Sequence, residues 1–118
     1  MKKGHNFREL VIWKNALSLV KEIYTITRKL PDDERFGFVS QMNRCSVSVP
    51  SNIAEGSGRG SDKDFVRFLR MAISSSYELE TQLILTQDLF GIETIELINR
   101  VTELQNKIGA FIRQLNVE

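Results

Sequence analysis

The feature of this sequence that most constrains its fold is the helical spacing of its apolar residues, which recurs in four long segments. The segments are residues 7–30, 36–56, 61–89 and 93–115. No clear alternation of apolar and polar residues, which a half-buried strand would need, competes with this spacing. The connections between the segments are short. The sequence therefore predicts an all-α fold, an antiparallel up-down-up-down four-helix bundle, formed by one domain over residues 1–118.

The segment at 7–30 is apolar over more of its surface than one bundle core requires. A core helix usually has about three apolar positions in seven, and this segment has about four. Its apolar residues fall into lines seven apart: Leu10, Leu17 and Tyr24; Trp13 and Val20; Ile12, Leu19 and Ile26; Ala16, Ile23 and Leu30. Either this helix is deeply buried, or the spare line contacts another copy of the chain. We expect a homo-oligomer in which the first two helices supply much of the contact.

Four local signals predict where the helices begin and end. Pro31 discourages helix at the preceding residue and ends the first segment. Pro50 falls inside the second segment, which favours a kinked, continuous helix over a break and restart. Ser61 is an N-cap to which Asp64 can reach back, and Gly91 is a C-terminal cap.

The single cysteine and single histidine exclude several kinds of chemistry. With only Cys45 and His5, the chain has no internal disulfide, no Cys-ligated zinc and no di-iron site built from Glu-x-x-His pairs. Cys45 is interpreted as a small buried side chain and His5 as solvated tail. The glycine-rich stretch 56–60 lacks the strand before it and the Lys-Ser or Lys-Thr after it that a phosphate loop carries. We expect no catalytic, cofactor or metal site.

Composition sets limits on the partners and the compartment. The formal net charge is only +1, with 16 basic and 15 acidic residues, so the protein is not basic over its whole surface. No run approaches the ~18 apolar residues of a membrane span, and no signal-peptide core follows the basic start. We expect a cytoplasmic protein with no membrane partner.

The charges are distributed unevenly along the chain. Residues 1–70 carry 13 basic and 8 acidic side chains, and the rest carry 3 and 7. An antiparallel bundle gathers the basic residues at one end, which could bind a nucleic-acid backbone. The best candidate contacts are Lys14, Arg59, Lys63, Arg67 and Arg70. The alternative is that these charges serve only helix ends and solubility.

Other charged residues are better explained as structural pairs than as acid–base catalysts. Positions equidistant from the turn near Gly60 lie at one height in an antiparallel hairpin. Arg44 should then lie level with Tyr77 and Glu78. By the same rule Glu55 should lie level with Arg67. We predict interhelical ion pairs or hydrogen bonds at both heights, which would fix the register of the hairpin.

Several runs of residues resemble one family closely, the four-helix-bundle family also called the 23S rRNA intervening-sequence proteins. The most specific is Pro-Ser-Asn-Ile-Ala-Glu-Gly at 50–56, preceded by 36–41 and 44–49. Matches outside these runs are Phe7, Leu10, Val11, Trp13, Ala16, Tyr24, Arg59, Ser61, Phe65 and the Glu-Leu-Glu-Thr of 78–81. The chain is also similar to the accessory protein of diversity-generating retroelements.

This resemblance implies a left-handed four-helix bundle that assembles as a ring, typically a homopentamer, with no enzymatic activity. Asn43 stands where the family often has the first of two arginines, which weakens the transfer of nucleic-acid binding. Asp64 replaces the usual glutamate, which is a mild change. Our first hypothesis is an oligomeric scaffold that binds RNA or DNA backbone at the basic end. The second is a scaffold for another protein, with no direct nucleic-acid contact.

Overall fold

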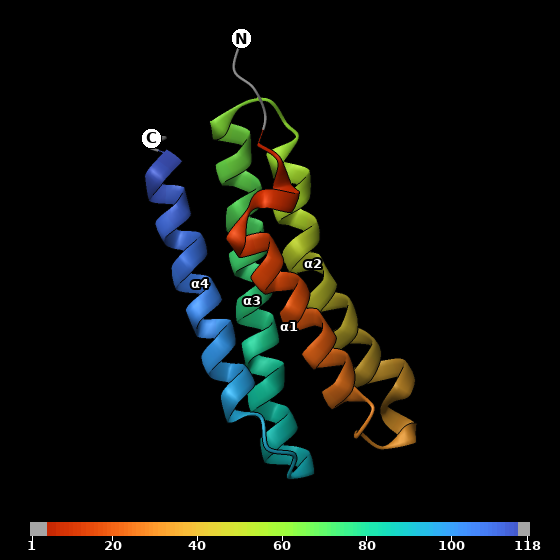
Figure 1. Ribbon diagram of the computed structural model, residues 1–118. Helices are drawn as coiled ribbons and strands as arrows, with labels where there is room; N and C mark the ends of the chain where they lie inside the picture. The colour runs from red at the N-terminus through yellow and green to blue at the C-terminus, as the bar shows by residue number, and fades with distance from the viewer. Residues whose placement is uncertain (1–4, 116–118) are drawn as a thin grey trace.

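The computed structural model describes residues 5–115, which form four long helices and three short helical turns (Figure 1). The helices are α1 (Val11–Thr27), α2 (Ser40–Ser57), α3 (Asp62–Phe90) and α4 (Ile95–Leu115). The short turns are η1 (Phe7–Glu9), η2 (Asp32–Glu34) and η3 (Arg35–Val39), the last of which is a π-helical turn. No strand occurs between residues 5 and 115. The all-α four-helix fold predicted from the sequence is therefore confirmed.

Successive helices run in opposite directions, and the molecule is elongated (Figure 1). α1 packs on α2 and α4, and α3 packs on the same two helices, so α1 and α3 lie diagonally across the bundle. The α2–α3 connection lies at the top of Figure 1, and we call this the turn end. The α1–α2 and α3–α4 connections lie at the bottom, and we call this the far end. The handedness of the bundle stays a prediction.

The core is a continuous apolar column contributed by all four helices, as the spacing of the sequence predicts. Residues with essentially no exposed surface include Ile23, Met42, Val49, Ile53, Leu69, Leu79, Leu83, Val101 and Ile108. Burial of such side chains is worth roughly 1.5–3 kcal/mol each relative to exposure. This column holds the four helices together and fixes which of their faces remain outside.

Three of the predicted helix signals are confirmed. The Ser61 Oγ accepts a hydrogen bond of 3.2 Å from the backbone N–H of Asp64. Gly91 has the left-handed backbone conformation (φ 67°), and its N–H donates to the carbonyl of Gln87. Pro50 is buried within α2, which continues through it, whereas the kink stays a prediction.

Two helix starts differ from the prediction. The first helix begins at Val11 and not at Phe7, because Leu10 is extended and the side chain of Asn6 caps the separate turn η1. The second segment enters through a π-helical turn at Arg35–Val39 before α2 begins at Ser40. That turn leaves Phe36 almost fully exposed at the far end.

Candidate functional site

Four of the five predicted nucleic-acid contacts lie together at the turn end. Arg59 follows α2, and Lys63, Arg67 and Arg70 lie on the exposed face of the first turns of α3. Lys14 is also exposed, but it lies on α1, which is diagonal to α3. We call the group at the connection and on α3, Arg59, Lys63, Arg67 and Arg70, the basic patch.

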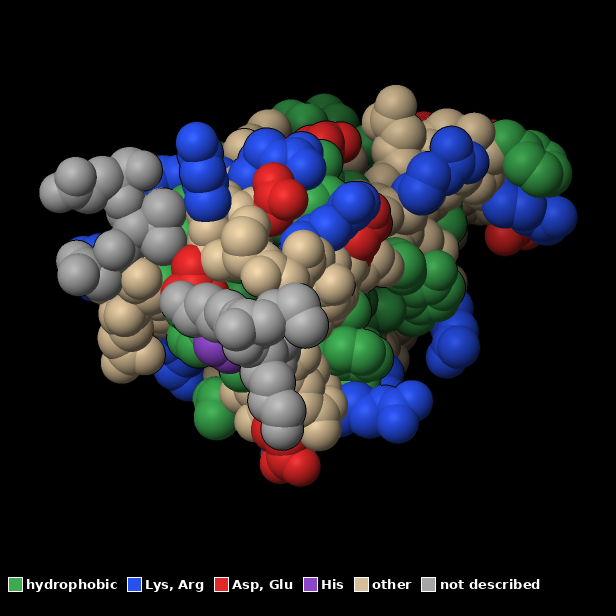
Figure 2. All heavy atoms as spheres, turned by 90° about the horizontal axis from the view of Figure 1, so that it is seen from above, with side chains coloured by type: hydrophobic (Ala, Val, Ile, Leu, Met, Phe, Trp, Pro, Cys, Tyr) green, Lys and Arg blue, Asp and Glu red, His purple; other side chains and the backbone are tan. Residues whose placement is uncertain are grey.

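Two arginines of the basic patch lie against the same buried aromatic ring. The guanidinium carbons of Arg59 and Arg67 lie 4.7 Å and 4.6 Å from the centre of the Phe68 ring. Each arginine also has an acidic neighbour: Arg59 is 2.7 Å from Glu55, and Arg67 is 3.5 Å from Asp64. Seen end-on, Lys and Arg side chains are interspersed with Asp and Glu at this end (Figure 2). Two of the four cations are thus partly neutralised and held in place.

The predicted interhelical pairs are not the ones that the structure forms. Arg67 and Glu55 each pair within three or four residues of themselves, with Asp64 and Arg59. Arg44 donates to the Ser40 Oγ at 3.2 Å, and no ion pair joins it to Glu78 among residues 5–115. Partners at i+3 or i+4 on the same exposed helix face are reached without crossing to another helix. These local partners replace the cross-helix pairs.

The prediction that His5 is solvated tail is wrong. Its backbone N–H donates to the carbonyl of Ser57, and its ring packs 5.0 Å from Phe65 and 6.0 Å from Phe111, centre to centre. Its Nε2 lies 3.6 Å from a carboxylate oxygen of Asp62. His5 thus contacts α2, α3 and α4 and closes the turn end. A lone histidine in a polar stretch of sequence carries no signal of this role.

Cys45 is buried between α2 and α3, as predicted, and its thiol donates to the carbonyl of Ser75 at 3.1 Å. Burial, with a smaller contribution from the negative charge of Glu78, raises the pKa of the Cys45 thiol to about 12. A nucleophilic cysteine needs a lowered pKa. The environment of Cys45 is therefore that of a structural residue.

An extended apolar hollow outside the core lies on the outer side of α1 and α2. One part, of about 260 Å³, is lined by Trp13, Leu17, Val20, Val47, Pro50, Ser51 and Ala54. It continues past Val47 into a part of about 510 Å³, lined by Tyr24, Arg35, Phe36, Val39, Ser40, Asn43, Arg44 and Val47. We call the two parts together the apolar groove. The spare apolar line predicted in the first helix lines it.

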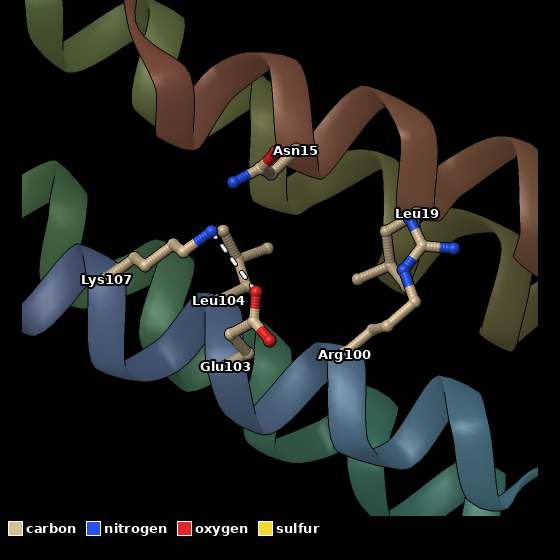
Figure 3. A pocket seen from close by; sticks show the side chains of 6 residues that line it. All are labelled: Asn15, Leu19, Arg100, Glu103, Leu104 and Lys107. Carbon is tan, nitrogen blue, oxygen red and sulfur yellow. Dashed lines mark ion pairs between the residues drawn. The ribbon is translucent and has the colours of Figure 1, made fainter.

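A second, polar pocket lies between α1 and α4 (Figure 3). Asn15 and Leu19 face Arg100, Glu103, Leu104 and Lys107 across a volume of only about 70 Å³. Arg100 donates to the Ser18 Oγ at 3.0 Å, and Lys107 lies 3.2 Å from Glu103. Its charges are already paired, so we assign it no ligand.

Neither a metal site nor a membrane span is found within the described part of the chain. No group of three or more His, Cys, Asp or Glu side chains between residues 5 and 115 could hold a metal ion. No helix in that range is long and apolar enough to cross a membrane.

The basic patch and the apolar groove are the two surfaces that we consider for function. The family model described as 23S rRNA-intervening sequence protein matches residues 8–114. The chain belongs to this family. The resemblance noted in the sequence is thereby confirmed over nearly all of its length.

A solved structure agrees with the family in fold. The chain is similar to a protein of unknown function from the S23 ribosomal protein family of Bacteroides thetaiotaomicron, with a TM-score of 0.79 and 24% sequence identity. The similarity covers 86% of this chain and 98% of that one. No curated protein matches the chain in sequence. The four-helix bundle is thus the shared property, and neither finding indicates a catalysed reaction.

Proposed function

We propose that this protein is a non-enzymatic scaffold that assembles with itself, as a ring that is typically pentameric in its family, and binds RNA or DNA backbone through the basic patch. The observation that carries the proposal is the apolar groove. Large contiguous apolar surfaces on soluble proteins mark interaction sites. Two helices and the exposed Phe36 contribute to this one. In a single bundle the apolar groove would be exposed to solvent.

The nucleic-acid part of the proposal is supported by the cations of the patch that remain available. Among residues 5–115, neither Lys63 nor Arg70 has an acidic ion-pair partner, and both are exposed. One patch is a weak site, because backbone binding grows with the number of phosphates that are neutralised. A closed assembly would repeat the patch in every copy and so strengthen the local field.

Sedimentation velocity at micromolar concentration tests the assembly. We expect a species several times the 13.6 kDa mass of one chain. The variant Val47→Glu, in the groove, should shift this species toward single chains. The control Ile95→Glu changes an exposed isoleucine at the start of α4, away from the groove, and should leave the mass unchanged. A wild-type protein that sediments as one chain would overturn the proposal.

Filter retention of labelled RNA and single-stranded DNA tests the ligand. Retention should fall steeply as salt rises, and the double variant Lys63→Ala, Arg70→Ala should weaken it at least about tenfold. The control Lys21→Ala, Lys29→Ala removes two exposed cations, one on α1 and one just after it, and should have little effect. Retention that is absent at low salt, or equal in both double variants, contradicts nucleic-acid binding at this patch.

The alternative function is a scaffold for another protein, with no contact to nucleic acid. The observation that favours it is the pairing of Arg59 with Glu55 and of Arg67 with Asp64, which lowers the net charge of the patch. A partner captured from lysate after nuclease treatment, and lost in Val47→Glu, would support this alternative. Under this alternative we also expect no retention of RNA or DNA on the filter.

A further inference from the structure

We infer that copies of this chain join side by side through two different surfaces. The exposed face of α3 in one copy packs into the apolar groove of the next. In this contact Arg44 on the rim of the groove faces Glu78 of the neighbouring copy. The inference rests on the proposed self-assembly and names the two surfaces that form it.

The exposed face of α3 has an apolar strip that nothing within the bundle covers. Tyr77, Ile84 and Leu85 are exposed to 57%, 43% and 38%, whereas Leu79 and Leu83 on the opposite side of the helix are fully buried. The exposed residues recur with helical spacing, so they share one face. We call Tyr77, Thr81, Ile84, Leu85 and Asp88 the α3 strip.

The strip and the groove agree in size and in type. From Tyr77 to Asp88 a helix rises about 16 Å, and the groove follows α2 from Val39 to Ala54, or about 22 Å. An amphipathic helix whose apolar face lies in a groove between two others is a common mode of protein recognition. The groove thus has room for the strip along its whole length.

The charges of the two surfaces are opposite. Three arginines, Arg28, Arg35 and Arg44, line the lower groove and its continuation toward the far end, where Asp32 is the one acidic lining residue among those described. Residues 71–90 of α3 contain no basic side chain, and two of their acidic ones, Glu78 and Asp88, are exposed, whereas Glu80 accepts a hydrogen bond from Gln105 of α4. Complementary charge of this kind orients two surfaces and selects the partner. A second copy therefore fits this groove better than an unrelated neutral helix does.

The two surfaces also lie at matching heights along the bundle. The Cys45 thiol donates to the Ser75 carbonyl, which places Arg44 close to the height of Glu78. The Phe38 and Phe90 rings lie 6.0 Å apart, so Arg35 lies nearer the far end than Asp88 by about five residues, or roughly 7 Å. Where the bundles stand parallel to the ring axis, copies related by rotation have no shift along the bundle, so the Arg44–Glu78 pair can form between neighbours of a closed ring.

Groove and strip are different surfaces on different sides of the protomer. The groove lies on α1 and α2, and the strip lies on α3, which is diagonal to α1. One copy can therefore offer its strip to one neighbour and its groove to another. Such a heterologous contact builds rings or filaments, whereas a twofold dimer would use one surface twice. The matching heights favour the ring.

Charge reversal tests the contact. Arg44→Glu and Glu78→Arg should each raise the dissociation constant of the assembly at least about tenfold, because like charges then meet across the interface. The variant that carries both changes should assemble again, since the pair is restored with its signs exchanged. Mixing the two single variants should restore association between unlike copies, which would alternate, so that a ring of five would keep one junction between like copies. The control Glu103→Arg reverses an exposed charge on α4 and should have no effect.

The outcomes separate this inference from the proposed function. If the wild type assembles and both reversals assemble equally well, the contact is wrong while self-assembly stands, and the groove is free for another polypeptide. If the wild type is a single chain, the proposed function itself fails. Urea unfolding of each variant shows whether it is folded. Should a reversal fail to fold, Arg44→Ala and Glu78→Ala replace it, with weaker assembly expected and unchanged assembly contradicting the contact.

Discussion

The seam between α2 and α3 differs from the seam between α1 and α4 in almost every respect. The first is tight: a Cβ on Gly56 would lie 2.6 Å from the Cβ of Phe68, and a cysteine thiol bonds directly to the backbone of the facing helix. The second holds a polar pocket, bridged by the contact of Arg100 with Ser18 (Figure 3). The comparison teaches that α2 and α3 form a rigid hairpin, on which the other two helices are fastened less uniformly.

Replacing a buried leucine by alanine in each seam should give the largest difference in the free energy of unfolding. Leu79 is fully buried in α3, one turn beyond Ser75, and Leu79→Ala should lower the free energy of unfolding by about 4 kcal/mol. Leu104 borders the polar pocket, where part of its surroundings is already open, and Leu104→Ala should cost about 2–3 kcal/mol. Urea denaturation of both variants measures this. Equal losses, or a larger loss at Leu104, would contradict the difference in packing.

A methyl group added at Gly56 tests the close approach itself. Gly56→Ala forces a Cβ against Phe68 and Phe65, and should destabilise by about 1–3 kcal/mol. Gly58→Ala is the matched control, because the nearest atom to its added Cβ is 3.8 Å away. Thermal unfolding should show a lower midpoint for the first variant only. A stable Gly56→Ala variant would mean that the two helices can separate at little cost.

Much of the bundle could be predicted from the sequence, because its features are local. The helical spacing of apolar residues places the core, and Ser61 and Gly91 cap their helices through their own side chain or backbone. The start of the first helix was missed because Asn6 caps a turn before it. The apolar spacing continues from Phe7 into the helix, so it does not show that the backbone is extended at Leu10.

The candidate site could be predicted only in part. The basic patch follows from the order of the helices, but its pairing does not, because Arg67 pairs with Asp64 on its own helix and not with Glu55 on the preceding helix. Antiparallel geometry gives the height of a residue and not the direction in which a long side chain lies. His5 was missed for a related reason: its partners Phe65 and Phe111 are distant in sequence.

The tight seam should also respond to pH through its thiol. In the folded protein the pKa of Cys45 is raised from 9.0 to about 12, so above pH 9 the unfolded chain loses this proton first. The free energy of unfolding should then fall as pH rises from 9 toward 12, by on the order of 1 kcal/mol at pH 10. Cys45→Ala removes this contribution, so the difference between the two proteins isolates it. Parallel pH curves would show that the thiol is not shielded.

The polar bridge of the α1–α4 seam should contribute least. Arg100 is exposed, donates to Ser18 at 3.0 Å and lies 3.9 Å from Glu22, so solvent screens its charge. Arg100→Ala should cost no more than about 0.5–1 kcal/mol, and Ser18→Ala combined with it should add almost nothing. Denaturation at low and high salt measures both. A loss above about 2 kcal/mol would mean that this bridge, and not apolar packing, fastens α4 to α1, which would reverse the ranking of the two seams.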